Sequence, residues 1–346
     1  MRCPADFHRR EFAMNIANET ALNPRPYLSF LLPCYNEGAV IEETCRRVKA
    51  VGEGLGRPYE IVLVNDGSSD DTLERLSRLA ATDASFVIVD LSRNHGHQLA
   101  LTAGLHFCAG ERILIMDADL QDPPELLPQM LPLMDQGAEV VYAQRRSRPG
   151  DHPIKRGACA VFYRLLNRLA DHPIPLDTGD FRLISRRVLE LVLQMPERHR
   201  FLRGMVSWVG FQQVPLLYDR DKRFAGETKY PLNRLVRLAL DGIFASSTRP
   251  LTLASYVGAL LGVGSLLFIV YALLSWLFVG KTPQGWTSLM IVITSIGSVQ
   301  LCVLGILGQY LGRMHEQLKG RPLFIVRGVH RKPGPIKDHP NAHPST

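Results

Sequence analysis

The sequence lacks several signals that would assign it to a common class of protein. Its six cysteines are scattered without a Cys-X-X-Cys pair, so we expect no zinc or redox site, and the unpaired cysteines suit a reducing compartment. No Gly-X-Gly-X-X-Gly follows the first expected strand and no Walker loop is present, which argues against a dinucleotide cofactor. Residues 1–26 contain no apolar signal-peptide core and are expected to be a disordered tail, with Met14 as an alternative start.

Charged residues are missing from two long stretches, Pro250–Gly280 and Thr282–Gly312. Each exceeds the roughly 20 residues that a helix needs to cross a bilayer. Trp276 and Trp286 lie near the ends of these stretches, as is typical of the interfacial belt of a membrane protein. We therefore expect a two-helix transmembrane hairpin over residues 250–312, and a pair of buried core helices is the alternative.

Basic residues flank this apolar region at both ends, whereas the connecting loop carries only Lys281. The flanking residues are Lys229, Arg234, Arg237 and Arg249 upstream, and Arg313, Lys319, Arg321, Arg327, Arg331 and Lys332 downstream. The positive-inside rule predicts a multi-pass protein of the inner (cytoplasmic) membrane whose large N-terminal domain and two termini are cytosolic. Much of the net charge of +7 lies at these flanks, so we expect no nucleic-acid partner.

Residues 27–145 alternate short apolar runs with amphipathic stretches. The apolar runs predict strands at Leu28–Leu32, Glu60–Val64, Phe86–Leu91, Arg112–Met116 and Glu139–Ala143. The stretches between them predict helices at Val40–Val51, Asp71–Ala81, Gln98–Cys108 and Pro124–Gln136. This alternation predicts an α/β domain with a mostly parallel, Rossmann-like sheet covered by helices on both faces.

After Arg148 the alternation weakens, but Phe181–Gln194 again reads as a strand followed by a helix. Pro231–Ala245 predicts an amphipathic helix directly before the apolar region. We expect this juxtamembrane segment, residues 231–249, to lie in the membrane interface, and packing on the soluble domain is the alternative.

The C-terminal segment, residues 313–346, is expected to be cytosolic and to end in a disordered tail. Within it, Pro322–Val326 reads as a lone strand. A lone strand is marginally stable by itself, so pairing with another subunit is the expectation.

Two carboxylates, Asp117 and Asp119, follow the fourth expected strand directly. In open α/β sheets, ligands bind beyond the carboxyl ends of the strands. Two carboxylates on one short loop can share a hard divalent cation, and a cation held by few protein oxygens usually also binds substrate phosphates. The alternative is an ordinary loop, but the preceding strand and the Asp122-Pro123-Pro124 helix start favour a site for a diphosphate.

Polar and aromatic side chains also follow the first two strands, where Tyr35 and Asp66 lie. A carboxylate at a strand end can accept a hydrogen bond from a base N–H, and a tyrosine ring can stack on a base. Each residue alone is more often part of a turn, as Asp66-Gly67 illustrates. Together with Asp117 and Asp119, they outline a site for a nucleoside diphosphate.

Several segments together resemble glycosyltransferase family 2. They are Leu32–Glu37, Val64–Asp70, Leu91–Asn94, Ala100–Gly104, Met116–Pro124, Thr178–Leu183 and Arg223–Tyr230. Within the last segment, Thr228 replaces a serine of the family pattern and keeps the hydroxyl. The chain is most similar to polyprenyl-phosphate glycosyltransferases of the bactoprenol glucosyltransferase type, related to dolichyl-phosphate mannose synthase, and the similarity extends from about residue 27 to residue 329.

The resemblance implies a GT-A fold for residues 27–230 and inverting transfer of a sugar from a nucleotide-sugar to a polyprenyl phosphate. The product would serve cell-envelope glycosylation. UDP-glucose is the first expectation for the donor, with a modified arabinose or mannose as alternatives. A homo-oligomer such as a tetramer, a downstream flippase and a second glycosyltransferase are the further partners that it implies.

The resemblance also assigns roles to individual residues. The nucleotide-sugar would be bound by Pro33, Tyr35, Glu37, Asp66, Arg93 and Asp117. Mg²⁺ or Mn²⁺ would be held by Asp117, Asp119 and Gln121. The catalytic residues would be Asp180, Arg223 and Lys229, and the acceptor phosphate would be bound by Arg145, Arg223 and Lys229.

Some of these roles have alternatives. Asp180 is the candidate general base, but a polyprenyl phosphate is already ionised near neutral pH, because its second pKa is about 6. Asp180 could instead orient Arg182 or the acceptor. Arg223 and Lys229 could anchor the chain to anionic lipid, and Arg145 could belong to a solvated basic face.

Two other functions compete with this interpretation. A processive polysaccharide synthase usually carries a Gln-X-X-Arg-Trp motif and more membrane spans, and neither is visible. A non-catalytic membrane scaffold would not need Asp117 and Asp119 intact. A lipid-directed sugar transferase therefore accounts for more of the sequence.

Overall fold

The computed structural model describes residues 25–146, 178–198, 200–218, 249–279 and 285–332. Four sequence predictions lie outside these ranges: the disordered tail up to residue 24, the basic loop that carries Arg223 and Lys229, the helix at Pro231–Ala245, and the disordered tail after residue 332. The chain forms two compact units. One holds the sheet and its helices, and the other holds the two long apolar helices.

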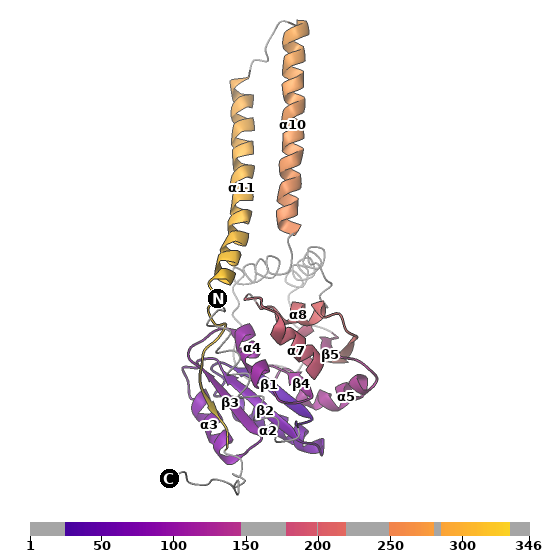
Figure 1. Ribbon diagram of the computed structural model, residues 1–346, viewed down its shortest axis with the longest axis vertical. Helices are drawn as coiled ribbons and strands as arrows, with labels where there is room; N and C mark the ends of the chain where they lie inside the picture. The colour runs from indigo at the N-terminus through magenta and orange to yellow at the C-terminus, as the bar shows by residue number, and fades with distance from the viewer. Residues whose placement is uncertain (1–24, 147–177, 199, 219–248, 280–284, 333–346) are drawn as a thin grey trace, which may run out of the picture. The chain divides into compact units, whose positions relative to one another are not determined.

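An eight-stranded sheet with the order β7-β5-β6-β4-β1-β2-β3-β8 forms the centre of the first unit (Figure 1). Its strands are β1 (Leu28–Cys34), β2 (Tyr59–Asn65), β3 (Phe86–Leu91), β4 (Arg112–Ile115), β5 (Val140–Arg145), β6 (Thr178–Ser185), β7 (Gln213–Tyr218) and β8 (Val326–His330). The central strands β4, β1, β2 and β3 are parallel. Their carboxyl ends therefore meet at one edge, as predicted for a mostly parallel sheet.

The strand β6 runs antiparallel to β4 on one side and to β5 on the other. Ile115 near the end of β4 pairs with Arg182, two residues beyond Asp180. The first residues of β6 consequently lie beside the carboxyl end of β4. The antiparallel direction of β6 therefore brings Asp180 to the same edge of the sheet as the predicted metal-binding loop after β4.

Helices cover both faces of the sheet. They are α2 (Ile41–Gly54), α3 (Thr72–Thr82), α4 (His97–Phe107), η1 (Pro124–Leu126), α5 (Leu127–Asp135), α7 (Arg186–Gln194) and α8 (Leu202–Trp208). The strands and helices predicted between residues 27 and 145 are confirmed to within a few residues at each end. The helix α8 and the strand β7 were not predicted.

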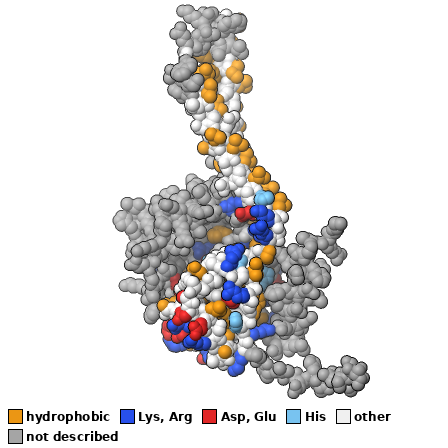
Figure 2. Space-filling model, turned by 90° about the vertical axis from the view of Figure 1, so that its left-hand side faces the viewer, with side chains coloured by type: hydrophobic (Ala, Val, Ile, Leu, Met, Phe, Trp, Pro, Cys, Tyr) orange, Lys and Arg blue, Asp and Glu red, His pale blue; other side chains and the backbone are white. Residues whose placement is uncertain are grey.

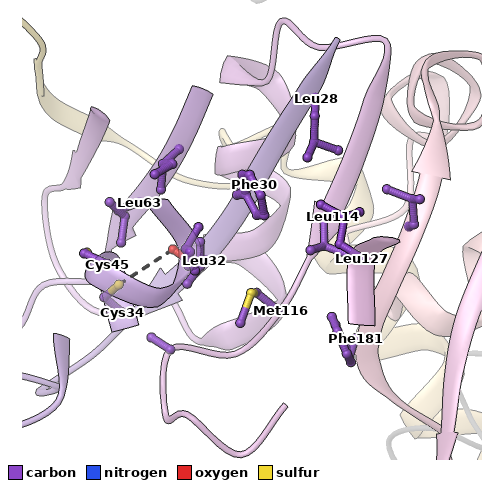
Figure 3. Packing of buried hydrophobic residues seen from close by; sticks show 14 of the residues in the cluster. Leu28, Phe30, Leu32, Cys34, Cys45, Leu63, Leu114, Met116, Leu127 and Phe181 are labelled. Carbon is purple, nitrogen blue, oxygen red and sulfur yellow. Dashed lines mark hydrogen bonds between the residues drawn. The ribbon is translucent and has the colours of Figure 1, made fainter. Parts of the chain in front are cut away.

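Alternate residues of β1 point into two separate cores. Phe30 and Leu32 pack with side chains of α2, α3 and α5 (Figure 3). Leu31 packs with α4, α7 and α8 on the opposite face. All three are completely buried, and burial of each such side chain contributes about 1.5–3 kcal/mol. Hydrophobic packing on both faces of the sheet thus holds its carboxyl edge in place.

Two long helices, α10 (Arg249–Val279) and α11 (Trp286–Leu318), form the second unit and run side by side. The windows Ala254–Tyr271 and Val292–Leu318 are long and apolar enough to cross a membrane. Most of their described large apolar side chains are exposed, and hydrophobic groups line the helix surface in Figure 2. This exposure contradicts the alternative of buried core helices.

The predicted C-terminal strand differs from the structure in position and in partner. The strand is Val326–His330 rather than Pro322–Val326, and it pairs antiparallel with β3 of the same chain, not with another subunit. Arg327 supports this pairing, because its guanidinium lies 3.5 Å from the buried carboxylate of Asp90 and donates to the Ser92 carbonyl. Periodicity within five residues could not reveal a partner more than 230 residues away.

Candidate active site

The loops that follow β1 and β2 are tied together by short polar side chains. Asn36 adopts a left-handed backbone with φ of 56°, and its side-chain oxygen accepts the N–H of Ser69 at 2.8 Å. Asp70 accepts N–H groups from Gly38 and Thr72, both at 3.1 Å. Asparagine and aspartate commonly stabilise turns in this way. These contacts fix the loops that carry the predicted nucleotide-binding residues.

Asp66, the predicted base-binding residue, is buried at the end of β2. Its two carboxylate oxygens accept backbone N–H groups from His95 at 2.7 Å and Gly96 at 2.9 Å. Burial raises the pKa of Asp66, although these two hydrogen bonds oppose the rise. A carboxylate oxygen can accept more than one hydrogen bond, so this arrangement is compatible with a base N–H as a further donor.

The loops after β2 and β3 approach each other closely at Gly67. Its φ is +65°, and a Cβ placed there would lie 2.5 Å from the backbone of Arg93 and Asn94. Only glycine fits such a position without strain. Gly67 therefore brings Asp66 and Arg93, two predicted nucleotide-binding residues, to the same corner of the edge.

The loop after β4 carries the predicted metal-binding residues. Asp119 accepts the N–H of Gln121 at 3.2 Å, and the hydroxyl of Thr44 on α2 donates to the Ala118 carbonyl at 2.8 Å. Between them, Leu120 is buried with a positive φ of 59°. A bulky residue in this backbone region is strained, and such strain is characteristic of functional loops. The loop is therefore held in one defined conformation.

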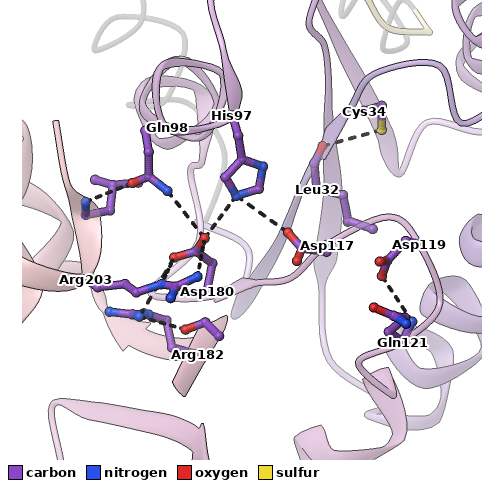
Figure 4. Close-up of polar contacts among 12 residues, drawn as sticks. Leu32, Cys34, His97, Gln98, Asp117, Asp119, Gln121, Asp180, Arg182 and Arg203 are labelled. Atoms are coloured by element: carbon purple, nitrogen blue, oxygen red, sulfur yellow. Dashed lines mark hydrogen bonds and ion pairs between the residues drawn. The ribbon is translucent and has the colours of Figure 1, made fainter. Parts of the chain in front are cut away.

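His97, the first residue of α4, lies between two carboxylates (Figure 4). Its Nε2 is 3.0 Å from Oδ2 of Asp180 and 3.6 Å from Oδ1 of Asp117. Asp117 comes from the loop after β4, and Asp180 comes from the start of β6. The imidazole thus connects the predicted metal-binding loop to the predicted catalytic aspartate.

Asp180 is buried and surrounded by donors. Arg203 of α8 donates from Nε at 2.8 Å and from Nη2 at 3.2 Å, and the amide of Gln98 donates at 3.3 Å. Arg182 lies 4.0 Å away and donates to the Gly179 carbonyl. A paired Arg–carboxylate contact of this kind fixes both groups in orientation.

These surroundings give the two aspartates opposite pKa shifts. Burial raises the pKa of Asp117 to about 6, with the charges of Asp180, Asp122 and Asp119 adding to the effect and His97 opposing it. Burial would also raise the pKa of Asp180, but Arg203, His97 and Arg182 together outweigh it and hold that pKa well below its usual value. Asp180 is therefore a stable carboxylate and a weak base in this arrangement.

Two observations bear on whether a divalent cation fits the loop after β4. In the part of the chain that the structure describes, no group of three or more His, Cys, Asp or Glu side chains is arranged to hold a metal ion. Asp117 and Asp119 are half-buried oxygen donors, and burial, with a smaller contribution from neighbouring carboxylates, raises the pKa of Asp117, so a bound cation would stabilise its ionised form. The loop fits a cation that takes its remaining ligands from a substrate.

The structure distributes the other predicted residues along the same edge. Tyr35 is half exposed, as a stacking residue would need to be, and Arg93 is exposed, whereas Pro33 is buried within β1. The backbone N–H of Glu37 donates a hydrogen bond to the Thr72 hydroxyl oxygen at 2.9 Å. The backbone of Arg145 ends β5 near the start of β6. Arg223 and Lys229 lie outside the described residues.

Sequence reasoning missed three residues around Asp180, namely His97, Gln98 and Arg203. A weak signal existed for the first two, because they follow the third predicted strand as the other motifs follow theirs. Arg203 gave no signal, because it is one arginine on a short helix that was not predicted. Its role becomes visible only when β6 brings Asp180 to the edge.

Comparison with known proteins supplies independent findings. Residues 29–193 match the family described as Glycosyl transferase family 2. The chain is 45% identical over 299 residues to an uncharacterized glycosyltransferase, YkcC, of Bacillus subtilis (strain 168), covering 86% of this chain and 93% of that protein. It is 37% identical over 304 residues to the SfII prophage-derived bactoprenol glucosyl transferase of Shigella flexneri, covering 88% and 98%.

A solved structure with a similar fold is glucosyl-3-phosphoglycerate synthase from Mycobacterium tuberculosis. Its TM-score is 0.43 at 20% sequence identity, and the match covers 67% of this chain and 82% of that chain.

Proposed function

The chain belongs to glycosyltransferase family 2, and on that premise we propose that it transfers glucose from UDP-glucose to a polyprenyl phosphate, with inversion at the anomeric carbon. The observation that carries the proposal is the junction of Asp117, His97 and Asp180 at the carboxyl edge of the sheet. The similarity to a bactoprenol glucosyl transferase over most of both chains supports glucose and a lipid phosphate as substrates.

The donor would lie along the loops after β1, β2 and β4. Tyr35 is exposed enough to stack on the base, and Asp66 can accept its N–H. Asp117, Asp119 and Gln121 would hold Mg²⁺ or Mn²⁺ beside the diphosphate. When bound, the cation supplies positive charge that stabilises the departing nucleoside diphosphate.

The acceptor needs no strong base in this mechanism. A phosphate monoester is ionised near neutral pH, because its second pKa is about 6, so its oxygen can attack the anomeric carbon directly. Asp180, with its depressed pKa, is better suited to hold Arg203 and His97 than to remove a proton. We propose that Arg145, Arg223 and Lys229 draw the acceptor phosphate to this edge by their charge.

We propose that α10 and α11 cross the inner membrane as a hairpin with both ends in the cytosol. The pairing of β8 with β3 supports an even number of crossings, because a strand that follows α11 completes a sheet made from residues that precede α10. The basic flanks favour the cytosolic side. A tag at Thr346 should be protected from externally added protease, and cleavage from outside would refute the topology.

A lipid carrier explains why a transferase would need a membrane anchor. Each CH₂ group withdrawn from the bilayer costs about 0.8 kcal/mol, so the sugar must be brought to the lipid. The homo-oligomer such as a tetramer, the downstream flippase and the second glycosyltransferase remain predictions.

The decisive experiment incubates the full chain in nanodiscs with a polyprenyl phosphate, Mn²⁺ and radiolabelled UDP-glucose. We expect the label to enter the lipid phase, and to do so less with GDP-mannose or a nucleotide-linked modified arabinose. No lipid-phase label from any donor would refute the transfer and favour the scaffold alternative.

Two matched variants distinguish a loss of metal binding from a loss of folding. Asp119→Ala should abolish lipid labelling and leave the thermal unfolding midpoint close to that of the wild type, because Asp119 is a half-buried loop residue that lies outside the two cores and accepts the N–H of Gln121 two residues away. Asp71→Ala, at an exposed ion pair with Arg75, serves as the control and should label lipid normally.

A further inference from the structure

His97 connects parts of the site that lie far apart in the sequence. Its Nε2 is 3.0 Å from Asp180, which is 83 residues later, and 3.6 Å from Asp117. We propose that His97 is a positioning residue that sets the spacing between the donor side of the site, at Asp117, and the acceptor side, at Asp180. The proposal rests on the transfer function above and extends it to a residue that no motif assigned.

The sheet itself creates the need for such a residue. Because β6 runs antiparallel to β4, their adjoining ends bring Asp117 and Asp180 to one edge. Two carboxylates at a shared site repel each other, and the repulsion is strong where burial lowers the effective dielectric. With its proton on Nε2, the tautomer that two neighbouring carboxylates favour, the His97 ring donates to Asp180 and also lies close to Asp117, so it holds the two groups at a defined separation.

His97 is itself held from both sides. The two preceding residues, His95 and Gly96, donate their backbone N–H groups to Asp66 at 2.7 and 2.9 Å. Behind it, α4 lies so close to the sheet that a Cβ on Gly104 would meet the Leu31 side chain at 2.1 Å. The ring is therefore carried by a rigid element, as a positioning group requires.

Gln98 holds Asp180 from the neighbouring position. Its amide nitrogen donates to Asp180 at 3.3 Å, and its oxygen accepts the N–H of Leu202 at 2.9 Å. Leu202 is the first residue of α8, and the next residue, Arg203, makes the paired contact with Asp180. The first turn of α4 thus fixes Asp180 directly and fixes the helix that carries its arginine.

Such positioning matters for an inverting transfer, in which the acceptor oxygen must approach the anomeric carbon opposite to the leaving group. A misplacement of about 1 Å can cost about 100-fold in rate. His97 would act through Asp117 and Asp180, so it is not a catalytic residue.

The first test measures Mn²⁺ affinity by electron paramagnetic resonance on the full chain in detergent, with UDP present. His97→Ala should weaken Mn²⁺ binding about tenfold, which is the usual scale for a lost contact to a metal ligand. His106→Ala is the matched control, because His106 is an exposed histidine near the other end of α4. An affinity for His97→Ala within twofold of the control would overturn the proposal.

The second test is a double-mutant cycle on the transfer rate with His97→Ala and Asp180→Asn. If the two residues act as a unit, each single variant loses about tenfold and the double variant loses no more. A loss of about 100-fold in the double variant, the product of the two, would show independent roles and overturn the proposal.

The His97→Gln variant distinguishes the loss of the His97 hydrogen bond from misfolding in both tests. The glutamine amide places N–H donors near the position of Nε2, so it should restore Mn²⁺ affinity and rate to within about threefold of wild type. A glutamine variant that folds but behaves like alanine would overturn the positioning role. If wild type binds Mn²⁺ yet labels no lipid, the transfer function fails, and the Mn²⁺ comparison still decides the role of His97.

Discussion

At the scale of single residues, the pKa of Asp180 distinguishes a general base from a residue that orients its neighbours. A general base contributes about 10²- to 10⁴-fold to a rate and leaves a titration step in the pH profile. Arg203, His97 and Arg182 outweigh the effect of burial and keep the pKa of Asp180 well below its usual value. Asp180 is therefore ionised throughout the neutral range and contributes no step there.

Asp180→Asn should accordingly lower the transfer rate by about tenfold, as expected for a lost orienting contact. Between about pH 6 and about pH 8, the ratio of the variant rate to the wild-type rate should vary only as far as His97 titrates, because Asp180 raises the pKa of that imidazole. Rates measured across this range on protein that remains folded test the prediction. A loss above 100-fold that varies with pH would restore Asp180 as the base.

Glu60 offers a residue-scale test at the opposite edge of the sheet. Its Oε1 accepts hydrogen bonds from the Ser29 hydroxyl and the Ala109 N–H. Burial raises the pKa of Glu60, although these bonds and the charge of Arg186 oppose the rise. The folded chain then binds a proton here more tightly than the unfolded chain. This contribution to stability is present below the unfolded pKa and is lost as pH rises through the folded pKa.

Glu60→Gln cannot ionise, and its amide oxygen can still accept both hydrogen bonds. The thermal unfolding midpoint of the variant should therefore rise relative to wild type as pH increases from about 4 to about 7. The slope with pH is the test, because a constant offset would reflect packing alone. If the unfolding midpoint of the variant falls relative to that of wild type over this range, the pKa of Glu60 is lowered by folding and the prediction is wrong.

At the scale of elements, α4 is the helix on which the site depends, because it carries His97 and Gln98. Gly104→Ala would place a Cβ 2.1 Å from Leu31 and 2.8 Å from Val64, both completely buried. Overpacking of this kind costs about 1–3 kcal/mol. We expect a lower thermal midpoint and slower transfer, because the helix must shift away from the sheet.

Gly54→Ala in α2 is the matched control, since a Cβ there meets nothing within 4 Å. Alanine can adopt the backbone conformation of Gly54, so the replacement should stabilise the chain by about 0.4–1 kcal/mol through the lower conformational entropy of the unfolded state. A Gly104→Ala variant as stable as Gly54→Ala would mean that α4 is not packed as closely as described.

The elements also show where sequence reasoning reaches its limit. The parallel core and the loop at Asp117 and Asp119 were predictable, because the period of apolar residues and the polar strand ends are local. The cluster around Asp180 was not, because the antiparallel entry of β6 decides its neighbours. Gln98 and Leu202 are 104 residues apart, and no local pattern connects them.

At the scale of the whole molecule, the last strand protects an edge of the sheet. Unpaired strand edges pair readily with other chains, and β8 covers the edge of β3. A chain that ends after Arg321 would expose that edge and leave buried Asp90 without the nearby charge of Arg327. We expect this truncated chain to self-associate in detergent.

A chain that ends after Lys332 keeps β8 and should elute from size-exclusion chromatography like the full chain. This pair of truncations differs only in residues 322–332, which contain the strand. Identical elution of the two truncated chains would show that β8 is not needed to cover the edge.

The position of β8 after α10 and α11 also determines the order in which parts of the chain are synthesised. The ribosome must translate α10 and α11 before it reaches the strand that finishes the sheet. Helices of such apolar length are expected to enter the bilayer as they emerge, so the transferase domain would acquire its final strand only after the chain is already anchored. An enzyme assembled in this order would mature at the surface where its lipid acceptor resides.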